Sequence, residues 1–205
     1  MGKNTAAHLT AFLTILIWGT TFIATKVLLR DFTPVEILFS RFTLGFLALS
    51  CVPGGIHFTT FRNELLFAGA GFSGVTLYFL FENIALQYTL VSNVGILVTV
   101  APFFTALLSR FFGKKEPLYP AFFIGFLLAL GGIALISFNG SVILKLNPAG
   151  DILAILAALV WAVYSIFMKR IGELGYPMIP ATRRVFFYGL LLMIPALFFM
   201  DFHPA

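Results

Sequence analysis

Charged residues are scarce in this chain: Asp, Glu, Lys and Arg make up only 10% of its 205 residues. Water-soluble domains usually carry about 25% charged residues, whereas this chain is 60% hydrophobic and has a mean hydropathy of +1.02. The formal net charge of +5 does not indicate nucleic acid, because the basic residues occur one to three at a time between apolar runs. We therefore expect the lipid bilayer as a partner, and no nucleic acid.

Cysteine and histidine are also rare, with a single cysteine, Cys51, and three histidines. These numbers allow no disulfide framework and no plausible metal cluster. The H-E-x-x-H, G-x-S-x-G, Walker A and G-x-G-x-x-G motifs are all missing from the sequence. Paired Asp residues, a Ser with a base, or a His-rich face, which an intramembrane enzyme would need, are missing too. We expect no enzyme, no metal, no cofactor and no direct coupling to ATP.

Long apolar runs dominate what is present. Seven of them are long enough for membrane-spanning helices, which need roughly 20 mostly apolar residues. They do not alternate apolar and polar residues at period two, as the strands of a membrane barrel would. The predicted fold class is all-α, a polytopic membrane helix bundle. The runs are residues 9–29, 34–52, 65–88, 93–112, 120–138, 152–171 and 178–200.

Local signals place several helix ends. Thr33, Pro34 and Glu36 supply a hydroxyl, a proline at the first helical position and an acid at the third, which predicts a capping box at the start of the second helix. The turns at 30–33 and 89–92 are so short that the helices they join must be antiparallel neighbours. Asn147, before Pro148, marks the approach to the sixth helix.

Charge in the loops predicts the orientation of the chain. If successive loops alternate between the two sides of the membrane, seven basic residues lie on the side of the N-terminus and three on the other. The positive-inside rule then places the N-terminus in the cytoplasm and the protein in the inner or plasma membrane. The seven are Lys3, Arg62, Arg110, Lys114, Lys115, Lys169 and Arg170, against Lys26, Arg30 and Lys145.

An internal repeat supplies the strongest clue to function. Displacing the sequence by 143 positions aligns residues that are rare in the chain, including both of its tryptophans. The first helix and its copy, the sixth, start on opposite sides, so we expect an inverted repeat of the kind from which many transporters are built. Residues 1–140 would form one five-helix unit, and 141–205 the first two helices of a second. The aligned pairs are Trp18 with Trp161, Lys26 with Lys169, Pro34 with Pro177 and Arg41 with Arg184.

Short motifs in four helices, with a glycine-rich fifth, resemble the EamA-type branch of the drug/metabolite transporter superfamily. Two departures are an extra basic residue in the turn at 113–117 and the lack of anything corresponding to helices eight to ten. The motifs are Trp18-Gly19-Thr20-Thr21-Phe22 with Lys26, Arg41-Phe42, Ala85-Leu86-Gln87-Tyr88-Thr89, Ala101-Pro102-Phe103-Phe104-Thr105-Ala106-Leu107-Leu108, and Gly125 with Gly131-Gly132.

The resemblance implies ten helices in two inverted five-helix repeats around a central cavity that opens alternately to each side. It implies transport without covalent chemistry. We expect a secondary carrier that exports a small organic metabolite, with export driven by the metabolite's gradient or by exchange with protons. A non-transporting membrane scaffold or receptor is the alternative, and an intramembrane enzyme is a weaker one.

Glu82 and Asn83 form the most informative polar pair, because they lie near the middle of the third helix. An ionisable side chain at that depth costs at least ~2.5 kcal/mol on insertion scales, so it should face protein or water. Tyr78 lies one turn earlier on the same face and could bond the carboxyl. These residues are candidates to line the cavity, where Glu82 would bind a cationic substrate group or carry a proton. The alternative is a neutral Glu82 or Asn83 that only bonds a neighbouring helix.

The repeated residues are further candidates. Trp18 and Trp161 lie mid-helix, where they either pack in the core or stack on an apolar or aromatic substrate. Arg41 and Arg184 either reach the lipid headgroups or form a gate latch with a carboxylate such as Glu36 or Glu82. Lys26 is a candidate of the same kind, anchoring its helix at the interface or acting in a gate.

Proline and small residues suggest how the helices bend and pack. Pro102 must interrupt the hydrogen bonding of the fourth helix, and the bend is either a hinge, a cavity wall or an ordinary kink. Small residues at 69–74 in the third helix, and glycines in the fifth, predict close helix packing. The alternative is that these small residues form the interface of a homodimer.

Overall fold

The computed structural model describes residues 3–55, 58–112, 119–138, 147–200 and 202, and this part of the chain is helical throughout apart from short turns. The expected all-α polytopic bundle is confirmed. The helical segments are α1 (Lys3–Leu28), α2 (Pro34–Ser50), α3 (Phe61–Ala70), η1 (Gly71–Leu77), α4 (Tyr78–Tyr88), α5 (Val91–Val98), α6 (Ala101–Phe112), α7 (Pro120–Phe138), α8 (Pro148–Glu173) and α9 (Met178–Phe199).

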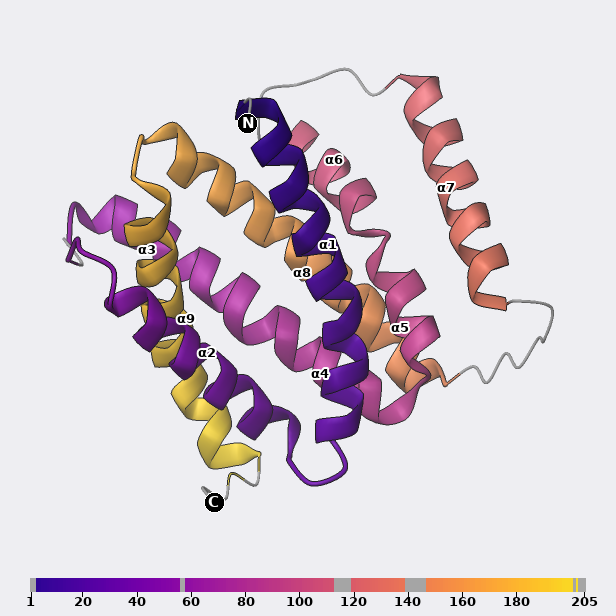
Figure 1. The fold of residues 1–205 in the computed structure, drawn as a ribbon, viewed down its shortest axis with the longest axis horizontal. Helices are drawn as coiled ribbons and strands as arrows, with labels where there is room; N and C mark the ends of the chain where they lie inside the picture. Colours follow the sequence, from indigo (N-terminus) through magenta and orange to yellow (C-terminus); the bar gives the residue numbers. More distant parts are fainter. Residues whose placement is uncertain (1–2, 56–57, 113–118, 139–146, 201, 203–205) are drawn as a thin grey trace.

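The helical segments in the described ranges make up seven rods, because α3, η1 and α4 follow one another without a break and only residues 99–100 separate α5 from α6. Figure 1 shows α3 and α4 running on along one line. Five of the seven are long and apolar enough to cross a membrane, namely Thr5–Leu28, Phe61–Tyr88, Val91–Phe112, Pro148–Glu173 and Met178–Phe199. The chain is therefore a multi-pass membrane protein.

The predicted capping box at the start of α2 is present. The backbone N–H of Thr33 donates to Oε2 of Glu36 at 2.7 Å, and the N–H of Glu36 donates to Oγ1 of Thr33 at 3.4 Å. At the start of α8, the side chain of Asn147 accepts from the N–H of Gly150 at 3.3 Å. Side-chain oxygens thus satisfy N–H groups that have no partner within the helix.

The third rod, α3–η1–α4, lies at the centre of the bundle. Half of its apolar window is buried, whereas only 6% of the window in α1 is. Its middle is not an α-helix, because η1 is π-helical over residues 71–77. Helices α8 and α9 pack along this rod, and α2 packs against both α4 and α9.

Small residues let α8 and α9 approach the third rod closely, as the sequence predicted. A Cβ atom added to Gly74 would lie 2.2 Å from the ring of Tyr164, and one added to Gly71 would lie 2.6 Å from the backbone of α9. For the fifth helix the close packing stays a prediction. Gly125, Gly131 and Gly132 of α7 have no atom within 4 Å of the added Cβ among the described residues.

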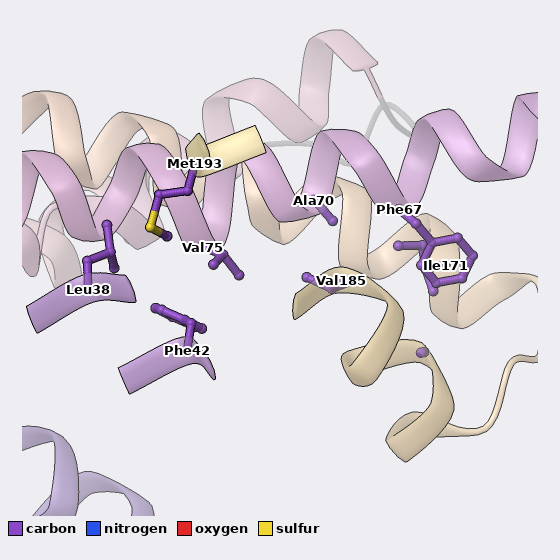
Figure 2. Packing of buried hydrophobic residues seen from close by; sticks show 9 residues of the cluster. Leu38, Phe42, Phe67, Ala70, Val75, Ile171, Val185 and Met193 are labelled. Atoms are coloured by element: carbon purple, nitrogen blue, oxygen red, sulfur yellow. The ribbon is translucent and has the colours of Figure 1, made fainter. Parts of the chain in front are cut away.

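The main hydrophobic core lies between the third rod and helices α2, α8 and α9. Figure 2 shows the side chains of this cluster converging from different helices. Phe67 is completely buried, and the ring of Phe42 meets that of Phe186 edge-on, with centroids 4.9 Å apart. The cluster consists of Leu38, Phe42, Phe67, Ala70, Val75, Ile171, Ala181, Val185 and Met193.

The bend expected at Pro102 is present as a break between α5 and α6 at residues 99–100. Pro102 has no N–H to give to the carbonyl four residues earlier, at Val98. The chain tightens there instead, and the N–H of Val100 donates to the carbonyl of Leu97 at 3.2 Å.

Helices α1 and α8 run in opposite directions. In Figure 1, α1 descends from the N-terminus at the top, while α8 rises from the lower right to the upper left. This is the relation that an inverted repeat requires of its first and sixth helices. The division into a five-helix unit and the start of a second one stays a prediction.

Candidate functional site

An aromatic cluster joins α1, α4 and α8, and its outer member, Trp18, is 54% exposed instead of lying in the core. The ring of Trp18 meets that of Trp161 edge-on, with centroids 5.8 Å apart. Trp161 also contacts Tyr78 at 4.7 Å and Tyr164 at 5.0 Å. Three of the residues expected to line the cavity thus touch one another. The two tryptophans that the repeat aligns are direct neighbours in space, although 143 positions separate them.

Glu82 lies directly beside this cluster. Its side chain is buried, with 3% of the residue exposed, and Tyr78, one turn earlier on α4, hydrogen-bonds its carboxyl group. Arg41 of α2 is close enough to interact with Glu82 electrostatically. The guanidinium carbon of Arg41 lies 4.1 Å from the centroid of the Phe79 ring. The centre of the bundle therefore holds an acidic and a basic side chain among aromatic rings.

Asn83 takes no part in this cluster. It is buried, and its Nδ2 donates to the carbonyl of Pro34 at 3.1 Å. Its Oδ1 has no hydrogen-bond partner among the residues that the structure describes. Asn83 thus ties α4 to the first turn of α2, which matches the alternative of a bond to a neighbouring helix.

A pocket of about 380 Å³ lies between α1 and α2. Arg41 forms part of its wall, together with two threonines and a serine. Its volume is within the ~300–1,000 Å³ that ligand pockets usually have. The lining residues are Thr21, Ala24, Thr25, Leu28, Phe32, Glu36, Ile37, Ser40, Arg41 and Leu44.

Lys26 binds the end of another helix. Its ammonium group donates to the carbonyls of Leu86 and Thr89 at the C-terminus of α4, the latter at 3.3 Å. A cation is favoured at a helix C-terminus, where carbonyl groups have no partner within the helix. This contact differs from the anchoring at the lipid interface that the sequence favoured. Lys169, the repeat partner of Lys26, is exposed.

Arg184 forms an ion pair, but with a carboxylate that the sequence analysis did not consider. Its Nη1 lies 3.3 Å from Oε1 of Glu64, and both side chains are largely buried, at 5% and 14% exposure. Glu64 also accepts from the hydroxyl of Tyr188 at 2.7 Å and from the N–H of Thr59 at 2.7 Å. The signal that could have identified Glu64 is an acidic residue directly before the third apolar run, residues 65–88.

Arg183 precedes Arg184 in α9, and the sequence allowed it the same two roles, reaching the lipid headgroups or forming a gate latch with a carboxylate. Its guanidinium donates to the carbonyls of Leu49, Val52 and Gly54, with a distance of 2.6 Å to Val52. These carbonyls belong to the end of α2 and the loop after it. Arg183 thus holds the end of α2 against α9, and it is buried there with 4% exposure.

Pro102 lies at the break between α5 and α6 and takes no part in the aromatic cluster. In the part of the chain that the structure describes, no group of three or more His, Cys, Asp or Glu residues could hold a metal ion. The groups that the site offers for binding are the carboxyl group of Glu82, the guanidinium of Arg41 and the faces of the aromatic rings.

Comparison with known proteins agrees with this architecture. The profile of the EamA-like transporter family matches residues 5–138. The chain belongs to this family. An "uncharacterized transporter" of Archaeoglobus fulgidus is 30% identical over 197 residues, which cover 94% of this chain and 67% of the relative.

Two further relatives are more distant. The uncharacterized transporter YdfC of Bacillus subtilis is 28% identical over 77% of this chain and 52% of its own length. The uncharacterized inner membrane transporter YedA of Escherichia coli is 26% identical over 91% of this chain and 60% of its own length. The chain thus spans between 52% and 67% of these three relatives. No solved structure matches the chain.

Proposed function

We propose that this EamA chain is part of a secondary-active transporter that exports a small organic metabolite across the inner or plasma membrane by alternating access. The N-terminus would lie in the cytoplasm. Membership of a transporter family and relatives named transporters support this proposal. So do the opposite directions of α1 and α8, since inverted units are the usual basis of alternating access.

Burial of Glu82 is the observation that carries the proposal. A carboxyl group within the membrane is costly and is retained where it binds a substrate or carries an ion. Glu82 lies beside Tyr78 and Arg41, and Tyr78 in turn contacts Trp161 of α8, so helices from both proposed repeats meet there. There it can receive one positive charge, either a cationic group of the substrate or a proton.

Two polar clusters at opposite ends of the third rod are suited to act as gates. At one end, the hydroxyl of Thr89 donates to Asp151 of α8 at 2.9 Å. At the other end, Glu64 pairs with Arg184 of α9. At 1.5 Å per residue, the 25 residues from Glu64 to Thr89 correspond to roughly 37 Å, about the thickness of a membrane. Each cluster ties a helix of the second proposed repeat to the first.

The substitution Glu82→Gln in the full-length protein tests the proposal. An untargeted metabolite comparison of cells with and without the full-length gene would first identify the exported compound. We expect Glu82→Gln to abolish its flux in proteoliposomes, or the dependence of this flux on pH, because glutamine carries no charge. Glu173→Gln is the matched control, because Glu173 is exposed at the end of α8, and it should transport normally.

Two results would contradict the proposal. Unchanged transport and pH dependence in Glu82→Gln would remove Glu82 from the mechanism. A full-length protein that moves no metabolite in cells or proteoliposomes would instead favour a membrane scaffold or receptor.

A further inference from the structure

Arg41 and Arg184 occupy equivalent positions in the repeat but have different partners. The guanidinium of Arg184 pairs with Glu64 at 3.3 Å and covers the ring of Phe67 at 4.3 Å. Arg41 covers the ring of Phe79 at a similar 4.1 Å. However, its guanidinium forms no hydrogen bond or ion pair with any residue in the described ranges. Of the two matched arginines, Arg184 is in direct contact with a carboxylate, whereas Arg41 interacts with Glu82 only through the longer-range attraction of their charges.

This difference is significant because a guanidinium carries five N–H donors and stays charged. Buried or half-buried donors normally have a partner, since an unpaired one costs free energy. Arg41 is half-buried, and it is one of the residues that line the pocket between α1 and α2. The aromatic rings of Phe79 and Phe42 occupy its other side, at 4.1 Å and 5.5 Å.

The rest of the pocket wall indicates the size and polarity of an occupant. Ala24, Leu28, Ile37 and Leu44 make most of it apolar. The hydroxyl of Ser40 lies next to Arg41 in the sequence and belongs to the same wall. An occupant should therefore have an apolar body and one group rich in acceptor oxygens, which an arginine binds in a bidentate manner.

We propose that the pocket between α1 and α2 binds a small organic anion, a carboxylate on an apolar body, and that Arg41 is its binding group. This site differs from the one that Glu82 offers to a positive charge. The inference goes beyond the proposed transport function, because binding to the pocket is measured without any flux. Either conclusion can therefore fail while the other holds.

Glu36 sets the direction in which an anion would lie in the pocket. Its carboxylate is part of the pocket wall and of the capping box, where it accepts from the N–H of Thr33. It lies five residues before Arg41, towards the start of α2. A negative charge there repels an anion, so the carboxylate of the ligand lies at Arg41 and away from Glu36. Removing this charge strengthens the binding of an anion and weakens that of a cation.

The experiment uses the 205-residue chain in nanodiscs of zwitterionic lipid, with hexanoate as the probe. Hexanamide and hexylamine are the neutral and cationic controls. Tryptophan fluorescence reports binding, because Trp18 lies one turn before Thr21 of the pocket wall and the chain has only two tryptophans. We expect hexanoate to bind at least tenfold more tightly than hexanamide, and hexylamine not to bind.

Four variants separate ligand binding from folding. Arg41→Gln should weaken hexanoate binding about tenfold or more, and Arg41→Lys should restore part of it. Glu36→Gln should strengthen binding, because glutamine keeps the capping box while the repelling charge is lost. Arg62→Gln, at an arginine exposed at the start of α3, should bind hexanoate as the unmodified chain does. Should Arg41→Gln fail to fold, the Glu36→Gln variant still tests whether the pocket binds an anion.

Equal binding of hexanoate and hexanamide, or unchanged or weaker binding in Glu36→Gln, would overturn the proposal. An anionic lipid presents the same chemistry as hexanoate, a negatively charged oxygen group on an apolar body. The titration is therefore repeated in nanodiscs that contain phosphatidylglycerol. Weaker apparent hexanoate binding there identifies a lipid headgroup as the natural occupant of the site, and unchanged binding identifies a soluble carboxylate.

Discussion

At the scale of single residues, the same side chain has a different environment in each copy of the repeat. Lys26 donates to two carbonyls at the end of α4, whereas Lys169 is exposed. Arg184 forms an ion pair with Glu64, whereas Arg41 lines a pocket. Only the tryptophans meet each other, with Trp18 against Trp161. Equivalent positions in the sequence therefore do not imply equivalent roles.

The lysine pair offers a direct test of this difference. We expect Lys26→Met to lower the stability of the chain by about 1–3 kcal/mol, because two carbonyls at the end of α4 lose their donor. Thermal unfolding in detergent micelles would measure the change. Lys169→Met is the matched control and should leave the melting temperature nearly unchanged, since Lys169 is exposed. Equal effects of the two substitutions would contradict the assigned contact.

At the scale of helices, the π-helical segment η1 decides which neighbours the third rod has. Glu64 and Glu82 are 18 residues apart, which is five turns at 3.6 residues per turn. A regular α-helix would place both on one face. In the structure Glu64 pairs with α9, while Glu82 lies beside Arg41 of α2. The π-helical turns between them change the rotation along the rod, and no sequence signal predicted that.

Glycine makes the contact between η1 and α9 possible, and this gives a second test. In Gly71→Ala, the new Cβ would lie 2.6 Å from both the N atom of Gly189 and the carbonyl oxygen of Val185. Since backbone atoms cannot move aside cheaply, we expect a loss of about 1–3 kcal/mol in stability.

The control for this test is Gly95→Ala in α5, because nothing lies within 4 Å of a Cβ at that position. It should leave stability unchanged or raise it by up to about 1 kcal/mol, the helix propensity of alanine over glycine. Thermal unfolding of both variants measures the difference. A Gly71→Ala variant as stable as the unmodified chain would mean that α9 does not pack closely on η1.

At the scale of the whole molecule, the arrangement of the helices matters more than any one side chain. Helices α1 and α8 run in opposite directions, and the aromatic cluster and Glu82 lie where they and α4 meet. The orientation of the bundle in the membrane stays a prediction from the basic residues in the loops.

The single cysteine tests this orientation. Cys51 is exposed at the end of α2, which the proposed topology places on the cytoplasmic side. In intact cells we expect a membrane-permeant maleimide to label it and an impermeant one to fail. Cys51→Ser combined with Asp31→Cys moves the thiol to the exposed turn before α2, where the impermeant reagent should react. Labelling of Cys51 from outside would reverse the topology.

Hydropathy, capping residues and the repeat were enough to predict seven helices, the start of α2 at Thr33 and the break near Pro102. These features depend on local chemistry: apolar length, a side-chain oxygen at a helix start, and a missing N–H. The pairing of Tyr78 with Glu82 was predictable too, because residues four apart on a helix lie on the same face.

The sequence by itself determined that the chain lies in a membrane as an antiparallel set of helices, because so few charges and such long apolar runs have no other stable arrangement. Only the tertiary structure decided the partners: Glu64 for Arg184, the end of α4 for Lys26, and an open pocket for Arg41. The contacts of Lys26 and Arg184 join residues at least 60 positions apart. They depend on the rotation and crossing of helices, which π-helical turns and close glycine contacts set and a linear pattern does not record.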